Sequence, residues 1–219
     1  MSFRVTLTIV SALAAASLGA APASAQSVNA ASDASEWVIG PIIGRRNYSV
    51  GMPLNPTPRR QGGFVIDLPT APGSVHYVTF RHGSLAGKRR IRMRYRLEAD
   101  RGTQIVASSD GKSGPIITPY FQRMGDDWRA RGRTETYRWY GTFATKLLAP
   151  GEYEIVAPLN ARWTAVETSN AHDAPEAFRA AVANADQVGF VLGGGDGFGH
   201  GVHVARGRAR LVVTDFRVE

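Results

Sequence analysis

The sequence predicts an all-β protein, a β-sandwich of the jelly-roll type with one short helix. Three observations favour this class. Short runs rich in β-branched and aromatic residues recur along the 219-residue chain, separated by turns drawn from its 24 glycines and 12 prolines. The longest of these runs alternates apolar and charged residues with a period of two. Only one segment has helical spacing, so alternating βαβ units are not expected.

The N-terminus has the layout of a secretory signal peptide. Arg4 precedes an uncharged run over residues 5–18, and the small residues Ala-Pro-Ala-Ser-Ala occupy positions 21–25. The run is shorter than the roughly 20 apolar residues that span a bilayer. We therefore expect residues 1–25 to be removed and the mature protein to be exported, periplasmic or extracellular, without stable membrane insertion. The chain has no cysteine, so neither disulfides nor a lipidated cysteine after this site are expected.

After the signal peptide we expect a flexible leader over residues 26–35, where small and polar residues prevail, and one domain over residues 36–219. The clearest strand covers residues 91–97, where apolar residues alternate with Arg92, Arg94 and Arg96. The last strand alternates until the step from Val213 to Phe216, which indicates a bulge. The predicted strands after the opening Trp37-Val38-Ile39 are residues 64–68, 75–80, 91–97, 104–107, 116–122, 134–140, 153–157, 163–168, 188–192 and 209–218.

One helix is expected over residues 174–185. Pro175 suits the first turn, and Glu176 complements the positive end of the helix dipole. Phe178 and Val182, four residues apart, share one apolar face.

The closing segments Val-Gly-Phe-Val-Leu-Gly-Gly-Gly (188–195), Gly-His-Gly-Val (199–202) and Ala-Arg-Leu-Val-Val-Thr-Asp-Phe (209–216) resemble those of galactose-binding-like jelly rolls. Trp-Val-Ile-Gly-Pro (37–41) with Asn-Tyr-Ser (47–49) is similar to the opening strand and loop of such a module. The resemblance spans most of the mature chain as a pattern of strands and glycines. It implies a jelly-roll fold and a carbohydrate-binding function, but it supplies no residue-by-residue ligand set.

The glycine-rich stretch 193–201 has two interpretations. Bare backbone N–H groups can cradle an anion, but the Gly-Lys-Ser/Thr ending of a phosphate loop is missing and no helix follows. A wide turn between strands is the favoured interpretation.

The same region contains His200 and His203, whose side chains would diverge in an extended strand, so no transition-metal site is predicted. No cofactor is expected either. The alternative is a structural Ca²⁺ ion held by carboxylates of the loops, which needs no special residue spacing. The loop candidates are Asp110, Asp126, Asp127 and Asp196.

An enzyme is not predicted. Glycoside hydrolysis needs two carboxylates about 5–10 Å apart across one cleft, and nothing in the sequence brings any two of the candidates together. These candidates are Glu135, Glu152, Glu154, Glu167 and Asp173. The chain has neither G-x-S-x-G nor cysteine, and no serine partner is evident for any of its five histidines.

Aromatic residues give the strongest indication of a binding site, because sugar rings stack their C–H faces on tryptophan and tyrosine. Six such residues fall between positions 120 and 163: Tyr120, Trp128, Tyr137, Trp139, Tyr140 and Trp163. One face of each strand must be core, so about half of these rings are structural. Trp128 stands apart in the charged loop 125–133, where a binding role and a structural role are equally open.

The arginines form a second candidate surface, at residues 88–96 and in the loop 129–133. Arginine binds carboxylate, sulfate and phosphate groups well, yet a solvated outer strand face is the favoured interpretation for residues 88–96. The formal net charge is +8 and favours anionic partners. Nucleic acid is not expected, since the chain is predicted to be exported and has no recognisable nucleic-acid module.

These observations predict an exported, non-catalytic module that binds carbohydrate or a cell-envelope glycan. Trp128, Trp139 and Tyr120 are expected to stack on sugar rings, with Arg129 and Arg131 contacting acidic groups. The first alternative is an envelope scaffold for protein contacts that has no small-molecule site. The second is an enzyme that acts on glycans. The sequence favours no particular oligomeric state.

Overall fold

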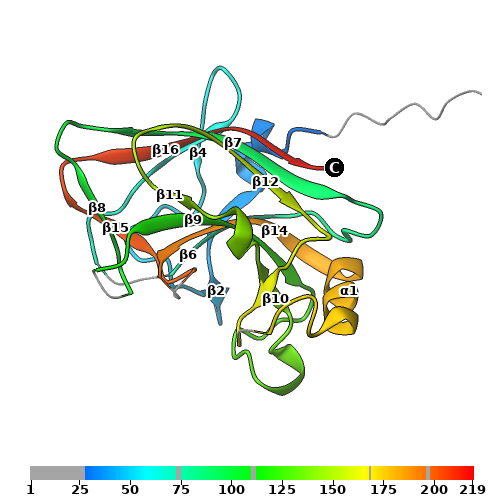
Figure 1. Cartoon of the computed structure of the whole chain (residues 1–219). Helices are drawn as coiled ribbons and strands as arrows, with labels where there is room; N and C mark the ends of the chain where they lie inside the picture. Colours follow the sequence, from blue (N-terminus) through cyan, green and yellow to red (C-terminus); the bar gives the residue numbers. More distant parts are fainter. Residues whose placement is uncertain (1–27, 73–74, 110–111, 168, 196–197) are drawn as a thin grey trace, which may run out of the picture.

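Two antiparallel β-sheets pack face to face in the computed structural model, which describes residues 28–72, 75–109, 112–167, 169–195 and 198–219 (Figure 1). The all-β sandwich with one α-helix is therefore confirmed. The predicted signal peptide, residues 1–25, lies outside the described residues. Within the described part of the chain, no helix is long and apolar enough to cross a membrane.

The first sheet has seven strands and the second has five. In spatial order the first comprises β1 (Trp37–Gly40), β6 (His76–Arg81), β14 (Ala185–Gly194), β9 (Pro115–Arg123), β10 (Arg138–Tyr140) and β13 (Thr164–Ala165), with β11 (Lys146–Leu147) also paired to β9. The second comprises β12 (Gly151–Pro158), β7 (Arg90–Ala99), β16 (Ala209–Val218), β5 (Phe64–Asp67) and β4 (Thr57–Pro58).

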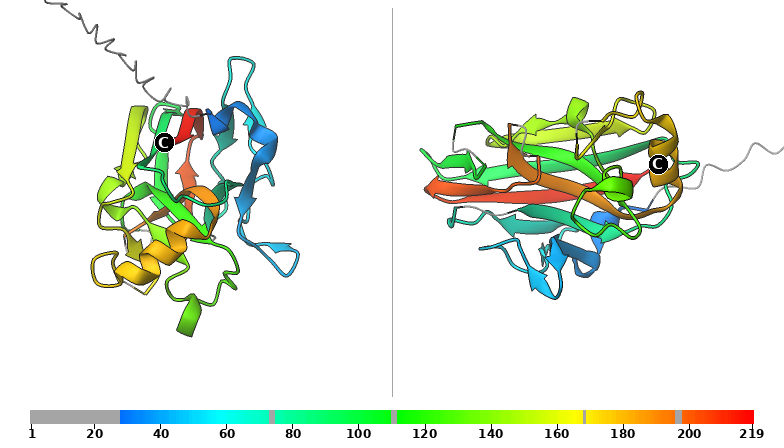
Figure 2. Two further views of the ribbon diagram at one scale, coloured as in Figure 1. Left: turned by 90° about the vertical axis from the view of Figure 1, so that its right-hand side faces the viewer. Right: turned by 90° about the horizontal axis from the view of Figure 1, so that it is seen from below.

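Smaller elements complete the fold. Two small antiparallel sheets pair β8 (Gln104–Ala107) with β15 (Val202–Arg206), which is distant in sequence, and β2 (Ile42–Ile43) with β3 (Arg46–Asn47), which forms a hairpin with it. The helix α1 (Pro175–Ala183) lies at one end of the sandwich (Figures 1 and 2). Short 3₁₀ turns are η1 (Ala30–Ser32), η2 (Ala34–Glu36), η3 (Gly132–Thr134) and η4 (Thr142–Ala144).

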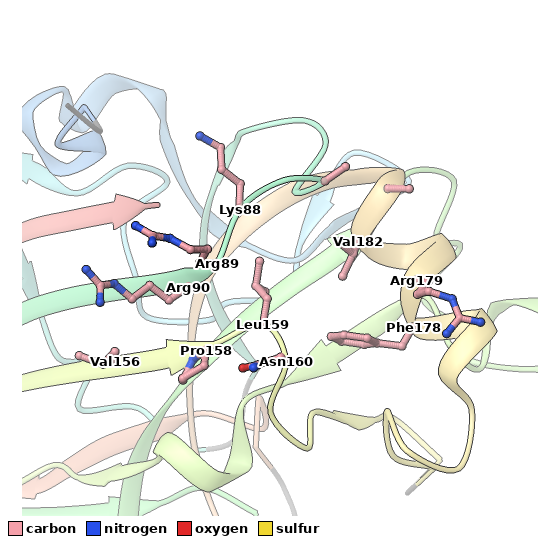
Figure 3. Close-up of a pocket in the computed structure, with 12 residues that line it drawn as sticks. Lys88, Arg89, Arg90, Val156, Pro158, Leu159, Asn160, Phe178, Arg179 and Val182 are labelled. Carbon is pink, nitrogen blue, oxygen red and sulfur yellow. The ribbon is translucent and has the colours of Figure 1, made fainter. Parts of the chain in front are cut away.

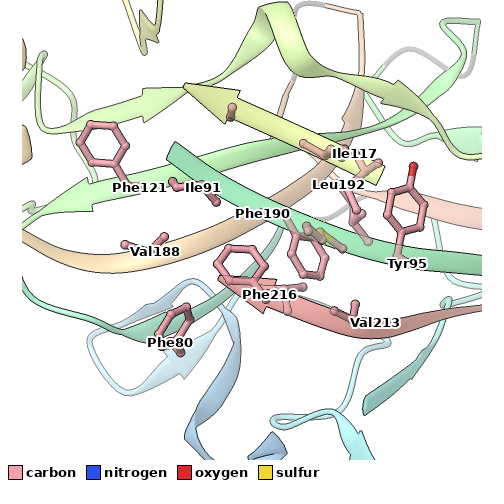
Figure 4. Packing of buried hydrophobic residues seen from close by; sticks show 14 of the residues in the cluster. Phe80, Ile91, Tyr95, Ile117, Phe121, Val188, Phe190, Leu192, Val213 and Phe216 are labelled. Atoms are coloured by element: carbon pink, nitrogen blue, oxygen red, sulfur yellow. The ribbon is translucent and has the colours of Figure 1, made fainter. Parts of the chain in front are cut away.

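The core lies between the two sheets and is rich in aromatic rings. Trp37 of β1 is fully buried, and its ring centroid lies 4.9 Å from that of Phe64, 4.7 Å from Phe80 and 5.0 Å from Phe216. Phe80, Phe190 and Phe216 come from three different strands and gather between the sheets (Figure 4). Each buried ring contributes about 2–3 kcal/mol of hydrophobic free energy. In a chain without cysteine, this packing replaces disulfides as the source of stability.

The alternation predicted for residues 91–97 is confirmed in β7. Its apolar side chains are buried in the core, and its arginines lie on the outer face of the second sheet. There Arg94 Nε lies 2.8 Å from Glu154 and Arg92 lies 3.4 Å from Asp215. Arg96 pairs with Glu98 and Glu152. The arginines of this strand thus belong to a charged, solvated lattice, as the favoured interpretation expected.

The bulge predicted near the end of the chain is present in β16. The pairing of β16 with β7 shifts register between Val213 and Asp215. Asn29 holds the irregular segment, because its amide nitrogen donates to the Thr214 carbonyl at 3.1 Å and its Oδ1 accepts from the Phe216 N–H at 2.9 Å. The bulge thereby becomes a docking point for the N-terminal segment.

We expected residues 26–35 to form a flexible leader, and this expectation is wrong for the part that docks on the bulge. From Asn29 onward the segment forms η1 and η2, and Ala31 and Ala34 are buried against the core. Small residues such as alanine fit where a larger side chain would not. The small residues that suggested a flexible segment therefore allow this segment to pack closely against the core.

Two predicted strands are shorter in the structure. Residues 134–140 reduce to β10, because Thr134 ends η3 and its hydroxyl bonds to the Arg131 carbonyl and the Asp127 carboxylate, each at 3.1 Å. Side chains of this type favour turns over strands. Of the predicted strand 163–168, residues 164–165 form β13, and residue 168 lies outside the described residues. The predicted helix is confirmed as α1, with the ring centroid of Phe178 4.9 Å from that of Trp139.

Candidate functional site

The outer face of the first sheet carries three buried tyrosines, which we call the tyrosine cluster: Tyr77 of β6, Tyr120 of β9 and Tyr140 of β10. The ring centroids of Tyr77 and Tyr120 lie 5.0 Å apart, and those of Tyr120 and Tyr140 lie 5.2 Å apart. The hydroxyls of Tyr77 and Tyr140 are hydrogen-bonded at 2.8 Å. Burial raises the pKa of Tyr120 and Tyr140 well above that of an exposed phenol, so both are neutral at physiological pH.

The loop after β9 folds over the tyrosine cluster in an uncommon backbone conformation. Trp128 has φ 65° and Ala130 has φ 51°, in the left-handed region that side chains other than glycine rarely adopt. Two consecutive aspartates stabilise it: Asp126 Oδ1 accepts from the Trp128 N–H at 2.9 Å, and Asp127 Oδ1 accepts from the Arg129 N–H at 3.0 Å. The backbone strain is thus offset by specific local hydrogen bonds.

A buried ion pair ties this loop to the sheet. Arg138 Nε of β10 lies 2.7 Å from Asp126 Oδ2, and their side chains are 8% and 0% exposed. Burial raises the pKa of the Asp126 carboxyl, and the Arg138 cation opposes that rise. The guanidinium carbon also lies 4.9 Å from the centroid of the Trp128 ring, in a cation–π arrangement. Because a buried pair gains little net stability, its main consequence is that it fixes the position of Trp128.

Trp128 lines a groove of about 360 Å³ that runs along β1, β6 and the edge of the loop. The β2–β3 hairpin and the loop that carries Trp128 project from the same side of the molecule (Figure 2). The lining residues with polar or aromatic side chains include Glu36, Tyr77, Thr79, Arg81, Trp128 and Gln187, of which Tyr77 and Thr79 are largely buried. The volume is within the range of small-molecule sites.

The groove combines an aromatic wall with hydrogen-bonding groups. Thr79 Oγ1 donates to Gln187 Oε1 at 3.0 Å, which leaves the Gln187 amide N–H₂ without a partner among the described residues. Arg81 is 82% exposed, with its Nε 3.4 Å from Asp186. Glu36 adds an exposed acceptor. This set can bond the hydroxyls and acidic groups of a ligand that covers an aromatic ring.

The predicted stacking residues separate into two groups. Trp128 is half-buried and lines the groove. Trp139 is fully buried in the core against Phe178, and Tyr120 is fully buried in the tyrosine cluster. A ring with no exposed surface cannot stack on a sugar, so the stacking role predicted for Trp139 and Tyr120 is wrong.

The two predicted arginines lie on the loop itself. Arg129 and Arg131 are both exposed, and neither lines the groove. Their contact with acidic groups of a ligand stays a prediction.

Sequence reasoning missed most of the groove-lining residues. Tyr77, Thr79 and Gln187 fall in the predicted strands 75–80 and 188–192 or next to them, but no role was assigned to them. A signal was present: residues 75–80 contain no acidic or basic side chain apart from His76, and such strands are buried on both faces. This pattern indicates that the outer face of that strand is covered, but it does not identify the loop that covers it.

The described residues that line the groove include no pair of carboxylates. Glu36 is the one carboxylate among the described residues that line the groove, and the candidates Glu152 and Glu154 pair with arginines of β7 on the other sheet. Ser49 Oγ does lie 2.7 Å from His76 Nδ1, a partnership the sequence did not indicate.

That serine–histidine pair is closed to ligands. Ser49 is 3% exposed and His76 is 1% exposed, and His76 Nε2 bonds to the Val202 carbonyl at 3.1 Å. Burial lowers the pKa of His76 to about 4, so the ring is neutral at physiological pH. The pair links the segment after β3 to β6 and β15.

The metal candidates likewise have structural partners. Asp126 and Asp127 bond within the loop, whereas Asp110 and Asp196 lie outside the described residues. His203 Nδ1 lies 3.1 Å from Ser108 Oγ. In the described part of the chain there is no group of three or more ligating side chains that could hold a metal ion.

The glycine-rich stretch 193–201, of which residues 196–197 are not described, packs closely against its neighbours at Gly194 and at Gly199. A Cβ atom on Gly199 would lie 2.4 Å from the Tyr77 ring. Only glycine lets the backbone approach the tyrosine cluster this closely. This agrees with the interpretation of the stretch as a turn.

No protein-family model matches this chain, and no curated protein matches it. The assignment of function therefore depends on the groove and its chemistry. Fold class alone would not support one, since sandwiches host many unrelated functions.

Proposed function

We propose that the chain is an exported, non-catalytic protein that binds a carbohydrate chain of the cell envelope in the groove beside Trp128. The observation that carries the proposal is a partly exposed tryptophan ring, fixed by a buried ion pair, next to hydrogen-bonding side chains in one groove. Sugars need this combination, because their apolar C–H faces stack on rings while their hydroxyls need polar partners. A preorganised ring also reduces the entropy cost of binding.

An acidic glycan suits the site better than a neutral one. Arg81 stands in the groove, and Arg129 and Arg131 are exposed on the adjoining loop. The formal net charge of +8 adds a long-range attraction for polyanions. The galactose-binding-like, jelly-roll relationship belongs to the same proposal, and the antiparallel two-sheet sandwich supports it.

Affinity electrophoresis of residues 26–219 tests the proposal. Gels would contain alginate, an acidic polymer, or dextran, a neutral one, at low and high salt. We expect alginate to retard the protein, and retardation to persist at high salt in part, because stacking is less sensitive to salt than charge contacts are. Trp128→Ala should abolish the salt-resistant part. Tyr48→Ala removes an exposed aromatic ring that does not line the groove, and it should leave retardation unchanged.

Two results would refute the carbohydrate site. Retardation that disappears entirely with salt would indicate arginine electrostatics alone. Equal retardation of the parent and Trp128→Ala, with matching urea unfolding curves to show that both are folded, would place any sugar contact elsewhere.

A second candidate function is an envelope scaffold for protein contacts. Large apolar side chains are exposed around the β2–β3 hairpin: Ile42 is 44% exposed, Val50 51% and Leu54 52%. Exposed apolar groups of this size commonly mark interaction surfaces. Absence of retardation by every polysaccharide, together with a saturable crosslink from a photoreactive residue placed at Val50, would favour this function.

A further inference from the structure

A second, larger pocket lies away from the groove and shares no residue with it. It has a volume of about 650 Å³ and is bounded by the turn before β7, the end of β12 and the helix α1 (Figure 3). The proposed glycan site assigns it no role. Its lining combines two kinds of side chain that define a ligand class.

The floor of this pocket is apolar. Leu159 and Phe178 face it from the segment after β12 and from α1, and Val182 lies one turn further along the helix (Figure 3). Pro158 and the exposed Val156 extend the apolar surface along β12. Asn160 is the one uncharged hydrogen-bonding side chain among the described lining residues. A sugar placed here would leave most of its hydroxyls without partners, at a cost in free energy.

The rim of the pocket is cationic. Its lining includes Lys88 and Arg89 of the turn before β7, Arg90 at the start of β7, and Arg179 of α1 on the far side (Figure 3). Among the described residues that line it there is no carboxylate. Four positive charges at one mouth raise the local concentration of anions.

These cations differ from the other arginines of the same sheet. Arg92, Arg94 and Arg96 all form ion pairs with acidic residues on the outer face. On the pocket rim Arg90 pairs with Glu219, its Nε 2.6 Å from the carboxylate. Lys88, Arg89 and Arg179 form no ion pair within the described residues. Three of the four rim charges are therefore available to an external anion.

We propose that this pocket binds a single-chain amphiphile with a phosphate headgroup. The phosphate lies at the rim, where guanidinium groups can each donate two parallel hydrogen bonds to its oxygens. A phosphate monoester carries a charge of about −1.5 to −2 at neutral pH, which matches several cations better than a carboxylate does. The alkyl chain covers Leu159, Phe178 and Val182. Both halves of the pocket are then satisfied by one molecule.

Isothermal titration calorimetry with dodecyl phosphate, below its critical micelle concentration, tests the proposal. We expect one molecule to bind per chain. Inorganic phosphate supplies the charge without the chain, and tetraethylene glycol dodecyl ether supplies the chain without a charge or a sugar. Each should bind at least about tenfold more weakly, because each loses one set of contacts. Failure of this binding leaves the glycan groove unaffected, since the two sites share no residue.

Variants locate the site. Lys88→Gln/Arg89→Gln should weaken dodecyl phosphate binding about tenfold, because two charge-assisted contacts are lost. The matched control Arg60→Gln/Arg101→Gln removes two exposed charges outside the pocket and should change affinity less than about twofold. Val156→Ser should weaken the dodecyl ester more than it weakens a butyl phosphate ester.

Four results would overturn the proposal. The first two are an affinity for tetraethylene glycol dodecyl ether, or for inorganic phosphate, equal to that for dodecyl phosphate. The third is an equal loss of affinity in the control pair. The fourth is binding to anionic lipid vesicles with none to the monomeric amphiphile. The last result would indicate a membrane-facing surface instead of a pocket for one molecule.

Discussion

The buried pair between Asp126 and Arg138 gives the most direct prediction about how the site is held. Replacing Arg138 with Met keeps the length of the side chain and removes its charge, which leaves the fully buried Asp126 carboxylate without its partner. Removal of one member of a buried pair costs about 3–5 kcal/mol. The cation–π contact with Trp128 is lost too, at about 1 kcal/mol. We therefore expect the free energy of unfolding to fall by about 4 kcal/mol.

A double-mutant cycle in urea, followed by tryptophan fluorescence, measures the interaction. Arg138→Met and Asp126→Asn should each destabilise the protein, and the double variant should be more stable than the sum predicts by at least about 1.5 kcal/mol. Effects that add to within about 0.5 kcal/mol would refute the reasoning, because independent residues behave in that way.

The same variant gives a second, pH-dependent readout. In Arg138→Met the burial that already raises the pKa of Asp126 is no longer opposed by a cation. The folded state then holds this proton more tightly than the unfolded state. Relative to the parent at the same pH, the free energy of unfolding of Arg138→Met should therefore fall as pH rises from about 4 toward neutrality. Groups that titrate alike in both proteins cancel in this difference.

The remaining predictions concern the frame around the groove. Burial lowers the pKa of His76 from 6.5 to about 4, so the unfolded state takes up a proton at a higher pH than the folded state. As pH falls from 7 to 4, the His76 contribution should therefore lower the free energy of unfolding by roughly 3 kcal/mol. His76→Gln should remove that part of the pH dependence, and an unchanged slope would contradict the prediction. Gly199→Ala should destabilise the protein by about 1–3 kcal/mol in urea, because the added methyl overlaps the Tyr77 ring, whereas a neutral effect would show that the tyrosine cluster gives way easily. Asn29→Ala should cost about 1–2 kcal/mol and speed exchange of the Phe216 amide, since two hydrogen bonds to the β16 bulge are lost and one of them is accepted from the Phe216 N–H. Unchanged exchange at Phe216 would mean that the N-terminal segment docks without these bonds.

Much of the fold could be predicted because period-two patterns report burial directly. The arginines of β7 alternate with core residues, and the broken alternation after Val213 marks the bulge. Helix α1 could be predicted because Pro175 suits the first turn of a helix and Phe178 lies four residues before Val182 on one apolar face. These signals are local, and each depends on neighbours along the chain.

The groove could be predicted only in part because it depends on contacts between distant segments. Trp128 stood out as a ring among charges, but its partner Arg138 lies in another strand and Gln187 lies much further along the chain. In β10, Trp139 and Arg138 alternate, and the pattern left open which face is core. Tertiary packing decided it, by placing α1 over Trp139 and the loop over Arg138.

The central claim is that Trp128 is the ring that meets a glycan, and the four indole N–H signals of the protein test it most directly. Trp37, Trp139 and Trp163 each donate their indole N–H to a backbone carbonyl inside the protein. In a ¹⁵N-resolved NMR titration with alginate oligosaccharides, we expect the Trp128 indole signal to shift and the other three to stay in place, and Trp128→Ala to lose binding. Saturable binding that leaves the Trp128 signal unmoved would contradict the account.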